Sequence, residues 1–223
     1  RRYAAVALLA LIALSSTAAA KCYPANTRVV IFVQGLYTTY DAGGTQTSFA
    51  EDHRFEMLKG AFAARGYAAK KLLDFSYAGG TFDAKGAWQP EPYPCEITDR
   101  RAAESVAVLD QTLRDYRSRH RGAHFALVGH SLGGYVAFLA GARDAARPEA
   151  ERLAIDVVVT LDSPLLGASA DKKVILDLID CDKTYVAGAE LAALRLDAGT
   201  ADVRRYQAWA MAHRFFDLPE AVK

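Results

Sequence analysis

The chain has few cysteines and no surplus of charge of either sign. It contains three cysteines, and its 27 lysines and arginines stand against 26 aspartates and glutamates, a formal net charge of +1. Without a basic surplus, nothing in the sequence points to a nucleic acid or an anionic surface as a partner. The sequence also has no Cys-x-x-Cys pair and no histidine-rich stretch, so it predicts no metal site.

Internal repeats, low-complexity tracts and an interdomain linker are absent as well. Hydrophobic residues make up 52% of the 223 residues and charged residues 24%, which allows a sizeable core and argues against disorder. The length is compatible with one domain. We therefore expect a single domain over residues 21–223, preceded by a segment of a different kind.

That N-terminal segment has the pattern of a secretory signal peptide. Arg1 and Arg2 precede an apolar run over residues 3–14, and three alanines close the segment at Ala20. The run is shorter than the roughly 20 apolar residues that span a bilayer. A buried core helix and an uncleaved anchor are the alternatives. We expect residues 1–20 to be a signal peptide and the protein to be secreted or periplasmic.

Export would make disulfide bonds possible. The three cysteines are Cys22, Cys95 and Cys181, so we expect one bonded pair and one cysteine left over. Three pairings are open, and the sequence does not choose among them. The alternative is that all three are unpaired, buried thiols.

Strands and helices are expected to alternate along the chain. The predicted strands cover residues 28–33, 69–77, 124–128 and 155–161, and the predicted helices cover residues 55–65, 99–119 and 132–146. This order favours an α/β fold with a mostly parallel central sheet and flanking helices. Thr98 is expected to cap the helix that begins at Asp99.

Residues 81–95 are predicted to be irregular. They contain three prolines and three aromatic residues, Phe82, Trp88 and Tyr93. Loops of this length and composition often form lids or walls of functional sites. The alternative is a surface loop that its own aromatic side chains pack.

The most informative motif is Gly129-His130-Ser131-Leu132-Gly133, a G-x-S-x-G sequence between a predicted strand and a predicted helix. In that context the serine sits on a tight, strained turn that lifts its hydroxyl above the sheet. Gly129 and Gly133 would leave room where a Cβ would clash. The backbone N–H of Leu132 would then donate to an oxyanion. The alternative is an ordinary strand–turn–helix connection.

A second oxyanion donor is expected from the loop after an early strand. Gln34-Gly35-Leu36 follows the predicted strand over residues 28–33. The N–H of Leu36 is the candidate donor, and Gly35 would let the backbone approach a substrate. An ordinary glycine-containing loop is the alternative.

Three motifs together resemble those of bacterial secreted lipases and esterases of the α/β-hydrolase superfamily. They are VQGL at residues 33–36, GHSLGG at residues 129–134 and TLDSPL at residues 160–165, and the similarity spans about residues 29–167. Such lipases commonly have histidine where this chain has Gln34. The resemblance implies an α/β-hydrolase fold and hydrolysis of carboxylic esters through an acyl-enzyme intermediate, without a cofactor. It also implies a small-molecule or lipid ester as substrate and transient contact with a lipid surface.

In this superfamily the catalytic residues follow the order serine, acid, histidine. Five histidines are present, and only His213 follows Ser131; the others are His53, His120, His124 and His130. His213 is therefore the expected base. However, residues 214–217 are typical of another core strand, whereas the catalytic histidine normally follows the last strand. The alternative is an incomplete triad in a chain truncated at its C-terminus, with the base encoded beyond Lys223.

The expected acid is Asp162, because it ends the predicted strand over residues 155–161 at the edge where such sites gather. Asp177, Asp180, Asp182 and Asp217 are the alternatives. The sequence thus predicts a secreted serine hydrolase with Ser131, Asp162 and His213 as its triad. The alternative is a non-catalytic or truncated hydrolase-like protein that acts as a binding module.

Overall fold

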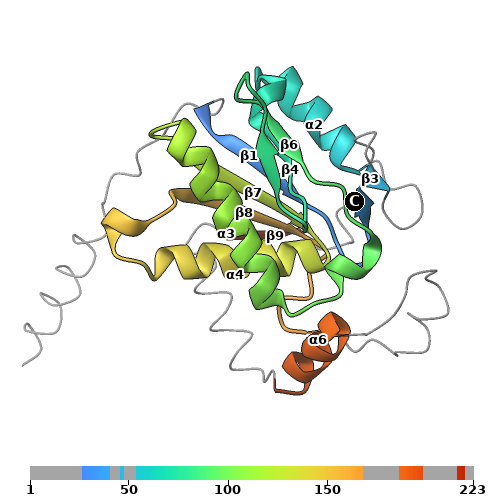
Figure 1. Cartoon of the computed structure of the whole chain (residues 1–223). Helices are drawn as coiled ribbons and strands as arrows, with labels where there is room; N and C mark the ends of the chain where they lie inside the picture. Colours follow the sequence, from blue (N-terminus) through green and yellow to red (C-terminus); the bar gives the residue numbers. More distant parts are fainter. Residues whose placement is uncertain (1–26, 41–45, 48–53, 168–185, 198–214, 219–223) are drawn as a thin grey trace, which may run out of the picture.

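The computed structural model describes residues 27–40, 46–47, 54–167, 186–197 and 215–218 (Figure 1). Several residues named above lie outside these ranges: residues 1–20, Cys22, His53, Asp177, Asp180, Cys181, Asp182 and His213. Within the described ranges, none of the helices is both long enough and apolar enough to cross a bilayer.

A five-stranded parallel sheet forms the centre of the fold, as the sequence predicts (Figure 1). The spatial order is β4 (Leu72–Asp74), β1 (Val29–Val33), β7 (Phe125–His130), β8 (Ile155–Leu161) and β9 (Phe215–Leu218). The chain leaves β1 towards β4 and returns to β7 on the other side of β1. In open α/β sheets, ligands bind outside the carboxyl ends of the strands where the connections diverge in this way.

Both faces of the sheet are covered, which explains why its central strands are continuously apolar. All five residues of β1 are buried. Its odd-numbered residues pack in the larger core cluster with helices α3 (Ala102–Arg119) and α4 (Leu132–Ala145). Its even-numbered residues Val30 and Phe32 pack on the other face with Phe55 of helix α2 (Arg54–Ala64).

The strand predicted over residues 69–77 is shorter in the structure. Residues Ala69–Lys71 form a 3₁₀ turn, η2, and only Leu72–Asp74 form β4. The chain then turns at Ser76, whose hydroxyl donates to the Glu91 carbonyl at 2.6 Å and accepts from the Ala78 N–H at 3.1 Å. Such local side-chain bonds compete with a strand ladder.

Residues 81–95 are not irregular, contrary to the prediction. Strands β5 (Gly80–Phe82) and β6 (Trp88–Pro90) form an antiparallel hairpin. The Asp83 carboxylate closes the turn by accepting from the N–H groups of Lys85 and Ala87, each at 2.8 Å. Further along, Tyr93 bridges to Tyr40 in the short hairpin of β2 (Thr39–Tyr40) and β3 (Gln46–Thr47).

Thr98 does not cap helix α3, which begins at Ala102 without a capping side chain at Arg101. Thr98 instead ends a 3₁₀ turn, η3 (Cys95–Thr98). The start of α3 is capped from α6 (Val186–Asp197), because the Glu190 carboxylate accepts from the Ala102 N–H at 2.9 Å.

The same pair of segments forms a second cap in the opposite sense. The Asp99 carboxylate, just before α3, accepts from the Ala187 N–H in the first turn of α6 at 2.9 Å. Carboxylates at helix N-termini are favourable because they satisfy orphan N–H groups and oppose the helix dipole. These two contacts fix α6 against the start of α3.

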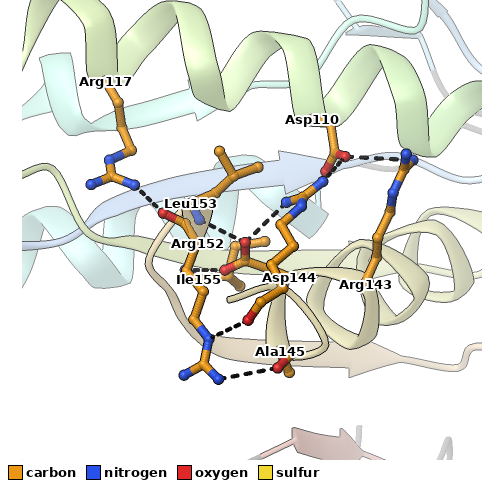
Figure 2. A network of polar contacts seen from close by, with 9 residues as sticks. Asp110, Arg117, Arg143, Asp144, Ala145, Arg152, Leu153 and Ile155 are labelled. Atoms are coloured by element: carbon orange, nitrogen blue, oxygen red, sulfur yellow. Dashed lines mark hydrogen bonds and ion pairs between the residues drawn. The ribbon is translucent and has the colours of Figure 1, made fainter. Parts of the chain in front are cut away.

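Charged groups hold the connection between α4 and β8, which includes the 3₁₀ turn η4 (Glu149–Glu151) (Figure 2). The Asp144 carboxylate accepts from the N–H groups of Leu153 at 2.6 Å and Ile155 at 3.3 Å. It also accepts from the Arg147 guanidinium at 2.9 Å, and Arg147 in turn pairs with Asp110 of α3. This network lies at the amino end of β8.

Candidate active site

Ser131 lies between β7 and α4 in a conformation that non-glycine residues rarely adopt. Its φ is 53° and its ψ is −127°. Its N–H donates to the Leu161 carbonyl at 2.9 Å, and its carbonyl accepts from the Gly134 N–H at 3.0 Å. Backbone strain of this kind stores about 1–3 kcal/mol and persists only where surrounding contacts enforce it. The strained strand–helix turn that the sequence predicts is therefore present.

Three glycines of the motif lie where a Cβ would clash, two of them with backbone and the third with a side chain. A Cβ on Gly129 would lie 2.4 Å from the Gly133 carbonyl oxygen, and one on Gly133 would lie 2.1 Å from the Val33 carbonyl oxygen. A Cβ on Gly134 would lie 1.7 Å from the Ser163 hydroxyl. These contacts bring the ends of β1, β7 and β8 together around Ser131.

The loop after β1 passes directly beside Ser131. A Cβ on Gly35 would lie 3.0 Å from the Ser131 Cβ and 3.5 Å from its Oγ. Among the described residues, neither the Leu36 N–H nor the Leu132 N–H has a hydrogen-bond acceptor, so both stay candidates for oxyanion donors. Leu36 is half-buried against the main core, and Leu132 is buried at the start of α4.

Three hydroxyl groups hold the backbone of residues 34–37, one from the next residue and two from distant segments. Tyr77 donates to the Gln34 carbonyl at 2.7 Å, and Thr38 donates to the Gly35 carbonyl at 3.0 Å. The third, the Thr98 hydroxyl, accepts from the Tyr37 N–H at 2.7 Å. The sequence analysis missed these three residues, because no motif marks them.

Burial keeps the hydroxyl of Tyr77 protonated. Desolvation raises the pKa of Tyr77 well above its ordinary value, the neighbouring Tyr93 raises it further, and Arg100 opposes the shift. The side chain is completely buried. Tyr77 therefore stays a hydrogen-bond donor to the loop at any pH at which the protein is assayed.

The predicted acid, Asp162, is at the same edge of the sheet as Ser131. It directly follows β8, and the carbonyl of its neighbour Leu161 accepts the Ser131 N–H. Its φ is 48°, so the backbone turns sharply at the end of the strand. Its role as the acid stays a prediction. Asp217, one of the alternatives, lies in β9 at the register of Thr160.

The predicted base, His213, lies outside the described residues. The strand predicted after it is confirmed: β9 joins the sheet parallel to β8, with Phe215 opposite Val158. Among the described histidines, His124 contacts Asp156 at 3.0 Å and directly precedes β7, and His120 lies against Tyr116 at the end of α3, so neither is at the carboxyl edge. His130 directly precedes Ser131. The assignment of the base stays a prediction.

Cys95 takes part in a disulfide bond. The prediction of one bonded pair is therefore favoured over three free thiols, and the pair includes Cys95. Its two possible partners, Cys22 and Cys181, lie outside the described residues.

A cavity of about 650 Å³ lies elsewhere, between the start of β1 and β4, the β5–β6 hairpin and the end of α3. It opens near the amino ends of the strands, opposite the edge that carries Ser131. The described residues include no group of three or more histidine, cysteine, aspartate or glutamate side chains that could hold a metal ion.

Residues 86–182 match the family described as Lipase (class 3). The match includes Ser131 and Asp162 and ends within the chain. No curated protein sequence matches the chain significantly.

Similar solved structures include phospholipase PlaB from Legionella pneumophila, with a TM-score of 0.53 and 13% identity over 86% of this chain and 38% of that chain. The same protein in complex with thio-NAD gives a TM-score of 0.51 and 13% identity over 86% and 36%. Esterase 2 of Thermogutta terrifontis, with a TM-score of 0.36 and 13% identity over 90% and 74%, is too distant to carry an argument.

This chain thus spans well under half the length of PlaB, and the likeness concerns the fold. The sheet order, the strained serine and the family match agree with one another. The chain therefore has the α/β-hydrolase fold, and its residues 86–182 are similar to the class 3 lipase family.

Proposed function

We propose that this chain is a secreted serine hydrolase that cleaves carboxylic esters through an acyl-enzyme intermediate on Ser131. The observation that carries the proposal is the backbone of Ser131, with φ 53° at the junction of β7 and α4. A strained turn at this junction presents the serine hydroxyl beyond the sheet, at the start of a helix whose dipole favours negative charge.

In this mechanism the Ser131 Oγ attacks the acyl carbonyl while a histidine base takes the hydroxyl proton, and chain order makes His213 the candidate for that base. The N–H groups of Leu36 and Leu132 hold the oxyanion of the tetrahedral intermediate. The protonated base then gives its proton to the leaving alcohol. Water next attacks the acyl-enzyme and gives a proton to the base, and the carboxylic acid product leaves as Ser131 regains its proton. Asp162 orients the base and stabilises its charged form.

Lipid esters are the proposed substrate class, with small esters as the simpler alternative. The class 3 lipase match supports this choice, and the structurally similar PlaB is named a phospholipase. Access to such substrates would involve transient contact with a lipid surface. Acyl chain length and headgroup are left open by these observations.

Secretion is supported by two independent features. Residues 1–20 have the signal-peptide pattern, and Cys95 forms a disulfide bond, which persists in oxidising compartments. Mass spectrometry of the exported protein should show a mature chain that begins near Lys21 or Cys22. A mature form that retains residues 3–20 would indicate an anchor instead.

The activity is tested with a fluorophosphonate probe and p-nitrophenyl esters. Wild-type protein should be labelled rapidly, and Ser131→Ala should lose both labelling and hydrolysis while keeping its circular dichroism spectrum. Ser118→Ala is the matched control, because this exposed serine lies at the end of α3 and only contacts the Asp115 carbonyl. An unlabelled wild-type protein would favour the non-catalytic binding module.

The base is tested separately by His213→Ala. Chain order assigns this residue, so we expect hydrolysis to fall to the level of Ser131→Ala. Retained hydrolysis would move the role to another residue while leaving the nucleophile assignment intact.

A further inference from the structure

We propose that Thr38 is a positioning residue for the oxyanion hole. Its hydroxyl, which is itself held by Tyr93, fixes the Gly35–Leu36 peptide so that the Leu36 N–H faces the oxyanion that forms at Ser131. This inference rests on the proposed function and adds to it two residues that no motif marks.

The direction of the hydrogen bonds follows from the number of protons. Thr38 Oγ1 lies 3.0 Å from the Gly35 carbonyl oxygen and 3.1 Å from the Tyr93 hydroxyl. A carbonyl can only accept, so the single Thr38 proton goes to Gly35. Tyr93 must therefore be the donor to Thr38. The result is a one-way relay from Tyr93 through Thr38 to the loop beside the nucleophile.

Peptide geometry carries the effect to the Leu36 N–H. The carbonyl of Gly35 and the N–H of Leu36 belong to one planar peptide, and in a trans peptide they point in opposite directions. No cis peptide bond is present in the described part of the chain. A hydroxyl that holds the carbonyl on one side therefore sets the direction of the N–H on the other side.

The position of Gly35 shows where that other side lies. The Cα of Gly35 is so close to Ser131 that an added Cβ would be 3.5 Å from the nucleophile oxygen. The next residue but one, Tyr37, has a φ of 59° and donates its N–H to Thr98. The turn thus uses the Tyr37 N–H structurally and leaves the Leu36 N–H for the substrate.

The relay is rigid and protected from water. Thr38 is 3% exposed and Tyr93 is 2% exposed. The Tyr93 backbone is fixed by paired hydrogen bonds with Tyr40, at 3.0 and 2.9 Å, and its ring packs edge-on against Tyr77. Segment 81–95, for which the sequence suggests a role as a site wall, thus reaches the site through its residue Tyr93.

The donor at the start of the relay does not ionise in ordinary assay conditions. Burial, together with the nearby Asp74 and Tyr40, raises the pKa of Tyr93 to about 12. The orientation of the loop should therefore be independent of pH across the working range of an ester hydrolase.

The test compares Thr38→Val, which keeps the shape and removes the hydroxyl, with Thr38→Ser, which restores it. Removing an oxyanion donor outright lowers kcat by about 100- to 1,000-fold, so disorienting one should lower it by about tenfold or more. We expect this loss in Thr38→Val with little change in KM, and near wild-type kcat in Thr38→Ser.

A second substrate separates positioning from a general loss of structure. In a thionoester the developing anion is on sulfur, which is a weak hydrogen-bond acceptor. Thr38→Val should therefore lower hydrolysis of the oxygen ester much more than that of the matched thionoester. Thr112→Val is the matched control, because Thr112 is equally buried and its hydroxyl donates to the Val108 carbonyl within α3. It should leave the ester-to-thionoester ratio unchanged.

The outcomes are distinguishable. If the wild-type protein is active and Thr38→Val keeps its kcat, or loses both substrates equally, the inference is overturned and the proposed function stands. If Thr38→Val fails to fold, Tyr93→Phe is measured, since it removes only the donor to Thr38. That variant should lower the ester-to-thionoester ratio in the same direction, and an unchanged ratio overturns the inference. A wild-type protein that the fluorophosphonate probe does not label contradicts the proposed function itself.

Discussion

The loop beside Ser131, at the carboxyl edge of the central sheet, is held by different chemistry from the amino edge. At the carboxyl edge, neutral hydroxyls of Thr38, Tyr77 and Thr98 hold the loop beside Ser131. At the amino edge, carboxylates and guanidinium groups form ion pairs, among them those of Arg147 with Asp144 and Asp110 (Figure 2). The oxyanion proposed at Ser131 gives this difference a physical reason. A carboxylate beside the oxyanion would raise its energy, whereas a hydroxyl orients a peptide without adding charge.

In the proposed reaction no charge develops at the amino edge, so ion pairs can hold the strands there. Asp156, early in β8, accepts from the Arg28 side chain at 2.8 Å and contacts His124 at 3.0 Å. These groups join the starts of β1, β7 and β8 in the same way that Asp144 joins α4 to β8. Under the proposed function, stability and catalysis depend on separate sets of residues, which mutations can separate.

The largest expected effect comes from the backbone packing at the carboxyl edge. Gly133→Ala would place a Cβ 2.1 Å from the Val33 carbonyl oxygen, and main chain cannot move away as a side chain can. We expect a loss of about 3 kcal/mol or more in the free energy of unfolding, together with loss of hydrolysis. Urea denaturation measures the first and a p-nitrophenyl ester assay the second.

Gly60→Ala is the control for this variant. A Cβ on Gly60, in the middle of α2, would meet nothing within 4 Å, so alanine should stabilise the helix by about 1 kcal/mol. Equal behaviour of the two variants would show that the close packing of the strand–helix turn at residues 129–133, the elbow, does not constrain the fold.

The elbow is also the part of the site that sequence predicts best. Its glycines and serine are adjacent in the chain, so the pattern at residues 129–133 carries the whole turn, and alternating apolar segments predict the parallel sheet. The supports of the elbow are not local. Thr38 meets Tyr93 55 residues away, Tyr37 meets Thr98 61 residues away, and Ala102 meets Glu190 88 residues away. No periodicity or motif in the sequence predicts such pairs.

The same reasoning explains the wrong predictions. Threonine is a common helix-capping residue, but the Thr98 hydroxyl instead donates to the Cys95 carbonyl and accepts from the Tyr37 N–H. Residues 81–95 have the prolines of a loop, yet Asp83 closes a hairpin within them. In both segments the hydrogen bonds of a single side chain decide between structures that composition alone does not distinguish.

The second prediction concerns the amino edge. Asp144→Asn removes the charge that balances Arg147 while keeping the shape of the side chain, and Asp144 is only 3% exposed. Asparagine offers one acceptor oxygen in place of two, so a buried donor loses its acceptor even though Arg147 keeps its pair with Asp110. We therefore expect a loss of about 3 kcal/mol in the free energy of unfolding. The kcat of the folded enzyme should stay at the wild-type value. A fall in kcat as large as that of Thr38→Val would break the contrast between the edges.

The third prediction concerns the loss of stability at alkaline pH when the Tyr93 hydroxyl ionises. The pKa of Tyr93 is raised by burial from 10.0 to about 12, so the folded state favours the neutral hydroxyl. Its contribution is fully present below pH 10 and is lost as the pH rises through about 12, a change of about 3 kcal/mol. Urea denaturation between pH 9 and pH 12 should show this fall. Tyr93→Phe should show a shallower fall, because it has one titrating group fewer. Identical slopes in the two proteins would mean that Tyr93 is not held neutral by the fold.

The smallest expected effect is that of Glu190→Ala, which tests whether charged groups on the carboxyl side of the sheet also position the loop beside Ser131. Glu190 and Asp99 are charged caps on the carboxyl side of the sheet, and Asp99 is the neighbour of Thr98, whose hydroxyl holds the Tyr37 N–H. Glu190→Ala should lower the free energy of unfolding by about 1 kcal/mol, because one N–H at the start of α3 loses its acceptor. It should leave kcat and the ester-to-thionoester ratio unchanged, since the loop is held by Thr98 rather than by the cap. A lower ratio in Glu190→Ala would show that α6 reaches the oxyanion loop through η3, and that charge as well as neutral hydroxyls positions the site.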